Sequence, residues 1–186
     1  NVGLYNLYGP TEAAIDVTHW TCVDDGGFSV PIGYPIANLV TYILDDSLQP
    51  QVQGGVGELY LGGIGLARGY HNRPELTAER FVASPFGSQG ERLYRTGDLA
   101  RYREDGVIEY VGRIDHQVKI RGLRIELGEI EACLLEHPSV REAVVIALDV
   151  GKSKQLVAYV IGDADLEPLK QHLRNALPEH MQPSHL

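Results

Sequence analysis

The sequence predicts an α+β fold in which a β-rich first part, forming a β-barrel or a twisted sheet, is followed by a small α+β unit. Up to Asp115, short apolar segments alternate with turn residues, as in antiparallel sheets. After Asp115, strand and helix patterns follow one another closely. The chain has 186 residues, which is enough for one large or two small domains with cores of their own.

In the first part, four segments have the composition of strands bounded by turns: residues 39–44, 57–61, 99–103 and 107–111. Glu104, Asp105 and Gly106 separate the last two and predict a hairpin turn. One short helix is expected at 74–81, because Pro74 suits the first helical turn and an acid after it favours the helix dipole.

The second part predicts the order strand, strand, helix, strand, strand, helix. Strands at 117–120 and 123–125 flank Arg121 and Gly122, and a helix begins at Glu126 or Leu127 and ends near His137. Two buried strands and a last helix are expected at 140–148, 155–161 and 167–177.

Composition narrows the possible functions. The formal charge of −9, without clusters of Lys or Arg, argues against a nucleic-acid partner. Cys22 and Cys133 lie far apart without C-x-x-C spacing, so free thiols in a reducing, cytoplasmic compartment are expected and their spacing implies no metal site. No apolar run reaches the roughly 18 residues of a membrane span, so no membrane partner is expected.

Residues 6–12, Asn-Leu-Tyr-Gly-Pro-Thr-Glu, combine side chains that suit a nucleotide. Gly9 and Pro10 favour a turn from which Tyr8, Thr11 and Glu12 can project toward one ligand. A tyrosine ring can stack on a purine, a threonine hydroxyl can donate to a phosphate oxygen, and a glutamate can hold Mg²⁺. The alternative is an ordinary loop with an exposed Thr-Glu pair.

Six motifs in order make the chain similar to the adenylation domains of nonribosomal peptide synthetases, and the resemblance covers essentially the whole chain. The last motif departs from the family at His180, where an aromatic residue is usual. The motifs lie at residues 6–12, 57–70, 94–98, 112–115, 117–131 and 177–183.

This resemblance implies that residues 1–114 are the C-terminal portion of the large adenylation subdomain, with its nucleotide-site loop and β-barrel. Residues 115–186 would be a truncated small C-terminal lid subdomain. In the family, a glycine-rich phosphate loop and an amine-binding acid come before the first of these motifs, and a catalytic lysine follows the last. None of the three is found here, and the first lysine is Lys119. We therefore expect an internal fragment that is inactive alone.

The resemblance also assigns an ATP site. Tyr8 would stack on adenine, Thr11 would contact the α-phosphate region and Glu12 would bind Mg²⁺. Asp98, on a Thr-Gly-Asp turn, would accept from both ribose hydroxyls and Arg113 would support the ribose and phosphates. Asn6 and Gly9 complete the predicted cofactor-binding set. The alternatives are a turn-capping aspartate at position 98 and a solvated arginine at position 113.

Two residues of the second part have roles implied by the two half-reactions of the family. These form an acyl-adenylate with release of pyrophosphate and then load the acyl group on the phosphopantetheine thiol of a carrier protein. Asp115 would be the hinge for rotation of the lid between the two steps, because few positions need to change φ and ψ in a hinge. Gly122 would leave room for the pantetheine arm, and the alternative is a plain hairpin glycine.

Leu7, Ile15 and Asp16 fall at positions that line the amino acid pocket in the family. A buried acid beside apolar groups suits a small hydroxylated side chain, so serine is expected, while threonine and other small residues stay open. The alternative is a solvated Asp16 at a strand edge.

Condensation and carrier domains of the same synthetase are the expected partners, and a siderophore or another secondary metabolite is the expected product. Other possible functions are an acyl- or aryl-CoA ligase of the same superfamily, or an inactive module that binds nucleotide or carrier protein.

Overall fold

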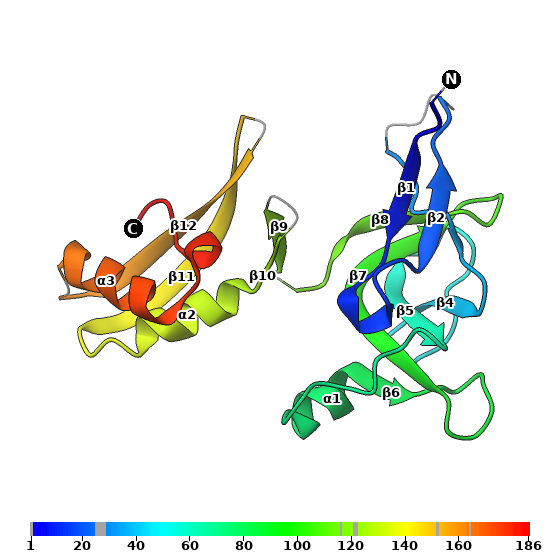
Figure 1. Cartoon of the computed structure of the whole chain (residues 1–186), viewed down its shortest axis with the longest axis horizontal. Helices are drawn as coiled ribbons and strands as arrows, with labels where there is room; N and C mark the ends of the chain where they lie inside the picture. Colours follow the sequence, from blue (N-terminus) through cyan, green and yellow to red (C-terminus); the bar gives the residue numbers. More distant parts are fainter. Residues whose placement is uncertain (1, 25–28, 116, 121–122, 152, 164) are drawn as a thin grey trace. The chain divides into compact units, whose positions relative to one another are not determined.

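The computed structural model describes residues 2–24, 29–115, 117–120, 123–151, 153–163 and 165–186. It confirms the predicted α+β fold class (Figure 1). The chain divides into two compact units, Asn1–Ile114 and Asp115–Leu186. The roles predicted for them as parts of an adenylation domain stay predictions at this point.

The first unit is built on a curled five-stranded antiparallel sheet. The strand order is β4-β5-β7-β6, and β8 also pairs with β7. Helix α1, at Pro74–Arg80, leads directly into β6 and begins with the predicted proline. The strands are β4 (Leu39–Leu44), β5 (Gly57–Gly63), β6 (Phe81–Ala83), β7 (Arg92–Tyr102) and β8 (Ile108–Arg113).

A second, three-stranded sheet of this unit contains β1 (Tyr5–Tyr8), β2 (Thr18–Thr21) and β3 (Tyr34–Pro35). It corrects the prediction that Tyr8, Thr11 and Glu12 project from one turn, because Tyr8 ends a strand and a 3₁₀ helix, η1, begins at Thr11 and ends at Ala13. The strand has no apolar alternation in its sequence, and only Tyr8 of its four residues is buried.

Strand β7 also differs from the prediction, because it begins at Arg92 and passes through the supposed Thr-Gly-Asp turn. Glu58 pairs with Leu99 and Tyr60 pairs with Arg95, so three residues of β7 face the single residue Leu59 of β5. The segment 96–98 is therefore a β-bulge. Gly97 has a φ of +72°, which the bulge requires and a glycine adopts without strain.

The second unit follows the predicted order of elements. The hairpin of β9 (Val118–Ile120) and β10 (Leu123–Ile125) precedes α2 (Leu127–Leu135). The long hairpin of β11 (Val140–Val150) and β12 (Ser153–Gly162) is followed by α3 (Leu166–Ala176) and the 3₁₀ helix η2 (Glu179–Met181). Residues from both helices and both long strands form one core, including Ile130, Val145, Leu156 and Leu173.

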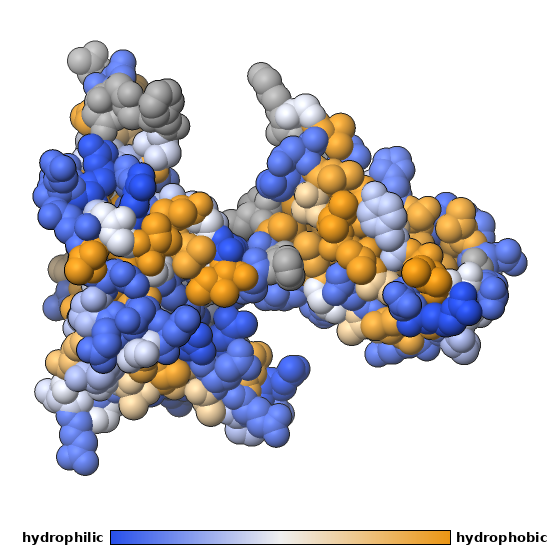
Figure 2. Space-filling view, turned by 180° about the vertical axis from the view of Figure 1, so that it is seen from behind, coloured by the Kyte–Doolittle hydropathy of each residue, from blue (hydrophilic) through white to orange (hydrophobic). Residues whose placement is uncertain are grey.

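The strands β11 and β12 are buried on one face only, which corrects the prediction of two buried strands, because the opposite face of the hairpin carries exposed apolar side chains. Figure 2 shows apolar surface gathered on this unit. Exposed members of the hairpin are Val144, Leu148, Val150, Tyr159 and Ile161. Among the described residues, no helix is long and apolar enough to cross a membrane.

Candidate functional site

The carboxylate of Asp98 lies at the end of the β7 bulge and is almost fully buried. Its side chain is 10% exposed, and Arg113 donates from Nη1 to its Oδ1 over 2.7 Å. The hydroxyl of Tyr8 donates to its other oxygen, Oδ2. Burial of a charge is tolerated when the charge is paired and hydrogen-bonded, and these two partners meet that condition. Each carboxylate oxygen has two lone pairs, so the group can accept further hydrogen bonds from a ligand.

Tyr8 holds its proton firmly in this arrangement. Burial, followed by the negative charge of Asp98 and the hydrogen bond to it, raises the pKa of the Tyr8 phenol well above its usual value. The phenol is therefore neutral at physiological pH and donates to Asp98. Its ring belongs to the core cluster of the first unit, which fixes its position.

Arg113 ends strand β8 directly opposite Asp98 in the strand register. Besides its ion pair, it donates from Nη2 to the carbonyl oxygen of Thr96 over 3.2 Å. One guanidinium thus holds both ends of the bulge. Its side chain is 12% exposed, so the alternative of a solvated arginine does not apply.

Glu58 supports the bulge from strand β5, a role that the sequence did not suggest. Its Oε1 accepts from the backbone N–H of Gly97 over 3.1 Å. Its Oε2 accepts from the hydroxyl of Tyr60 and from Nη2 of Arg95, both over 3.0 Å. The hydroxyl of Thr96 adds a bond to the carbonyl of Leu59 over 2.6 Å. Side chains of neighbouring strands therefore fix the backbone that carries Asp98.

Glu12, the predicted Mg²⁺ ligand, is half-buried on η1. Its Oε1 accepts from the hydroxyl of Tyr70 over 2.7 Å, and that hydroxyl lies 3.5 Å from the hydroxyl of Tyr94. Burial, followed by the hydrogen bonds with Tyr94 and Glu12, raises the pKa of Tyr70 above its usual range. Tyr70 and Tyr94 lie in two of the six motifs, but these motifs do not predict that Tyr70 contacts Glu12.

The other residues predicted to bind the cofactor differ in their surroundings. Thr11 is exposed at the start of η1. Gly9 lies against the backbone of residues 15–17, where an added Cβ would come within 2.8 Å of the nitrogen of Val17. Asn6 donates from Nδ2 to the carbonyl of Pro31 over 2.8 Å. Gly9 and Asn6 therefore have structural roles, and contact with a cofactor stays a prediction for all three.

Leu7, Ile15 and Asp16 are exposed, and two of them lie in a strained segment. Ala14 and Ile15 have φ values of +62° and +73°. The N–H of Asp16 donates to the carbonyl of Ala14 over 2.9 Å, which closes a three-residue turn around Ile15. A β-branched residue at positive φ is an outlier, and such strain is concentrated at functional sites.

Asp115 is the first residue of the second unit. Its Oδ1 accepts from the backbone N–H of Gln117 over 3.2 Å, as in an Asx turn. The contact stabilises a local turn and leaves the hinge role as a prediction. Gly122, predicted to face the pantetheine arm, lies outside the described residues.

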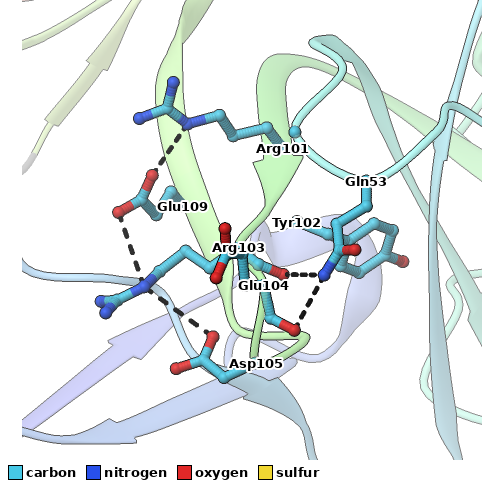
Figure 3. Close-up of a pocket in the computed structure, with 8 residues that line it drawn as sticks. Gln53, Arg101, Tyr102, Arg103, Glu104, Asp105 and Glu109 are labelled. Atoms are coloured by element: carbon cyan, nitrogen blue, oxygen red, sulfur yellow. Dashed lines mark hydrogen bonds and ion pairs between the residues drawn. The ribbon is translucent and has the colours of Figure 1, made fainter.

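A polar groove of about 640 Å³ lies at the other end of the β7–β8 hairpin (Figure 3). Arg101 pairs with Glu109 over 2.8 Å within it. Gln53 donates from Nε2 to the carbonyls of Arg103 and Glu104, over 3.1 and 2.8 Å. The polar groups of the groove therefore stabilise the hairpin turn. None of the predicted site residues lines the groove.

Comparison with known proteins places the chain in a family. The AMP-binding enzyme model matches residues 1–71, and the model of the AMP-binding enzyme C-terminal domain matches residues 129–186. The two models together match more than half of the chain.

Among curated relatives, a dimodular nonribosomal peptide synthase from Bacillus subtilis is 53% identical over 186 residues, which are 96% of this chain and 8% of that protein. The solved structure of holo-PA1221, a synthetase protein with adenylation and PCP domains bound to a vinylsulfonamide inhibitor, is 32% identical with a TM-score of 0.88. It is matched over 100% of this chain and 33% of its own. The adenylation domain AlmE of Vibrio cholerae, in complex with glycyl-adenosine-5'-phosphate, is 31% identical with a TM-score of 0.86, over 98% of this chain and 36% of its own.

The chain belongs to the AMP-binding enzymes, the class that both family models define. Within that class it is part of the adenylation domain of a nonribosomal peptide synthetase, as its six motifs predicted. It spans a small part of the curated relatives and about a third of the solved adenylation proteins.

Proposed function

We propose that the protein containing this chain is an ATP-dependent ligase that activates an amino acid as aminoacyl-AMP. In this reaction the substrate carboxylate attacks the α-phosphorus of ATP and pyrophosphate leaves. The observation that carries the proposal is the buried carboxylate of Asp98, held by Tyr8 and Arg113 on a braced bulge. A carboxylate fixed in this way suits a vicinal diol, because one group can accept from both hydroxyls.

Glu12 is proposed to hold the Mg²⁺ that accompanies ATP. Mg²⁺ in nucleotide sites is usually bound by one or two carboxylates together with substrate phosphates, and a single glutamate fits that pattern. The bound ion would neutralise phosphate charge. The bond from Tyr70 would hold the carboxylate of Glu12 in one orientation.

We further propose that the intact protein loads its amino acid on a carrier domain. The phosphopantetheine thiol would attack the acyl carbon and AMP would leave. The occurrence of adenylation and PCP domains in one relative, holo-PA1221, supports this step. Peptidyl carrier and condensation domains of the same synthetase are the proposed partners, and Gly122 is proposed to face the pantetheine arm.

Amino acid dependent exchange of pyrophosphate into ATP tests the proposed activity. The intact protein should catalyse the exchange, whereas the 186-residue chain alone should not, because it spans about a third of the solved adenylation proteins. No exchange by the intact protein with any amino acid would overturn the ligase proposal. Exchange by the chain alone would show that the residues outside it are dispensable.

Serine is the proposed substrate. The proposal rests on Leu7, Ile15 and Asp16, which fall at positions that line the amino acid pocket in the resembled family. Their side chains are exposed in this chain, and the carboxylate of Asp16 can accept from a substrate hydroxyl. Alanine lacks that hydroxyl and would leave the carboxylate without its donor.

The specificity constants of the intact protein for serine and alanine test this assignment. Asp16→Ala should lower the specificity constant for serine by an amount equivalent to about 1.5 to 3 kcal/mol, the range for a hydrogen bond to a charged group. The ratio of the constants for serine and alanine should fall as well. Asp46→Ala is the control, since Asp46 is an exposed aspartate on another loop. Preference of the unmodified protein for a large apolar amino acid would exclude serine and leave the ligase proposal intact.

A further inference from the structure

Three side chains that commonly bind metals meet between the two helices of the second unit. Cys133 lies in the last turn of α2, Glu136 is its C-cap residue and His172 lies on α3. One potential ligand atom from each residue lies within 4.8 Å of the others. No sequence motif predicts this cluster, because His172 is 39 positions from Cys133. None of the three belongs to the predicted nucleotide, substrate or hinge residues.

The hydrogen bond of His172 leaves one of its ring nitrogens with a lone pair that can bind a metal ion. Its Nε2 lies 2.8 Å from the carbonyl oxygen of Cys133. Because a carbonyl oxygen only accepts, Nε2 carries the hydrogen, and in the neutral ring Nδ1 then has the free lone pair. Histidines that bind metals typically donate their other N–H to a carbonyl or carboxylate in this way. Capping of the C-terminal end of α2 would account for the hydrogen bond from His172 to the carbonyl of Cys133. It would not account for the thiol of Cys133 and the carboxylate of Glu136 beside the ring.

The charges around the thiol favour a cation. Cys133 is 6% exposed, and Glu136 and Glu129 are its negatively charged neighbours. A bound divalent cation would offset these negative charges and deprotonate a coordinating thiol.

We propose that Cys133, Glu136 and His172 form a binding site for Zn²⁺ that joins α2 to α3. Sulfur, nitrogen and carboxylate oxygen are the ligands that zinc prefers, and three protein ligands leave the fourth position to water. With bonds of about 2.0 to 2.3 Å, ligand atoms in a tetrahedral site lie about 3.5 Å apart. The three ligand atoms, which lie within 4.8 Å of one another, would therefore move closer together when an ion binds. Binding releases the thiol proton to solvent.

Titration of the full 186-residue chain with Co²⁺, a spectroscopic substitute for zinc, tests the site. We expect one Co²⁺ per chain, a thiolate-to-cobalt charge-transfer absorption, and loss of that absorption when Zn²⁺ is added. Cys133→Ser should abolish the absorption. Glu136→Gln and His172→Gln should each weaken Co²⁺ binding by at least about tenfold, the effect typical of disturbing a metal site.

Cys22→Ser is the matched control, because Cys22 is the other free cysteine and lies in the first unit. It should leave the absorption unchanged. Absence of the absorption in the unmodified chain, its survival in Cys133→Ser or its loss in Cys22→Ser would each overturn the proposal.

A second measurement separates loss of the site from loss of the fold. Zn²⁺ should raise the thermal midpoint of the unmodified chain and of Cys22→Ser, because a ligand that binds the folded state stabilises it. The midpoint of Glu136→Gln should rise less, and this exposed residue can be replaced without disturbing the core. Equal increases for the unmodified chain and Glu136→Gln would also overturn the proposal.

Discussion

At the scale of single residues, the contacts of the site join side chains that are far apart in the sequence. The partners Tyr8 and Asp98 are 90 positions apart, and Glu12 and Tyr70 are 58 apart. Motifs can predict which residues belong to a site, because each motif is local. They cannot predict which hydroxyl donates to which carboxylate, because that depends on how the strands pair. The sequence therefore named Tyr8, Asp98 and Glu12 but assigned no role to Tyr70.

Asp98→Ala in the intact protein should weaken ATP binding by about 1.5 to 3 kcal/mol, since hydrogen bonds to a charged group are lost. Isothermal titration calorimetry measures the affinity. Circular dichroism should first show that the variant is folded, because the change also leaves Arg113 without its buried ion pair. An unchanged ATP affinity would remove Asp98 from the site.

Tyr70→Phe should raise the Mg²⁺ concentration needed for half-maximal pyrophosphate exchange by the intact protein. The variant keeps the ring in the core but loses the hydroxyl that orients Glu12. Tyr102→Phe is the control, because it loses a phenol that donates to the carbonyl of Thr41 in the same unit. If both variants need the same Mg²⁺ concentration, orientation of Glu12 by Tyr70 is not important.

At the scale of elements, regular patterns were predictable and irregular ones were not. The strand at 39–44, the helix after Arg73 and the six elements of the second unit have clear periodicity or turn signals, and the structure contains them. The sequence of residues 96–98 predicts a turn where the structure has a bulge, because glycine at positive φ occurs in both. A bulge is distinguished from a turn by how the segment pairs with a neighbouring strand. Here three residues of β7 face Leu59 of β5, which lies 37 positions before Thr96 in the sequence, so a local pattern does not reveal the bulge.

Glu58→Ala should lower the free energy of unfolding of the first unit by about 1 to 3 kcal/mol, because it leaves the buried N–H of Gly97 without an acceptor. Trp20 is the single tryptophan of the chain and lies in that unit, so its fluorescence during urea denaturation reports on the relevant transition. Glu104→Ala, which removes an exposed acid from the same unit, should have little effect. Equal midpoints for the two variants would contradict the proposed bracing.

At the scale of the whole molecule, two compact units with separate cores meet between Ile114 and Asp115. The change from turn-separated strands to mixed elements predicted a boundary there, because composition and periodicity change together. Neither composition nor periodicity predicts the proposed hinge at this boundary, since a hinge depends on the φ and ψ freedom of a few residues.

Asp115→Pro in the intact protein should slow adenylate formation and transfer to the carrier unequally. Proline fixes φ at about −65°, which would hold the junction in one conformation. Single-turnover rates of the two steps provide the measurement, and transfer should be affected more. Asp115→Ala is the control, because it removes the bond to Gln117 but keeps φ free. Equal slowing of both steps would indicate misfolding rather than a hinge.

The position of the Asp98 cluster relative to this junction bears on the construction of chimeric synthetases. Tyr8, Glu58, Thr96 and Arg113, which hold Asp98 and its bulge, all come before Asp115. A splice between Ile114 and Asp115 would therefore keep these contacts within one parent sequence. A splice placed a few residues closer to the N-terminus, before Arg113, would take Asp98 and Arg113 from different parent sequences. The junction after Ile114 is thus the natural place to exchange the second unit between related proteins.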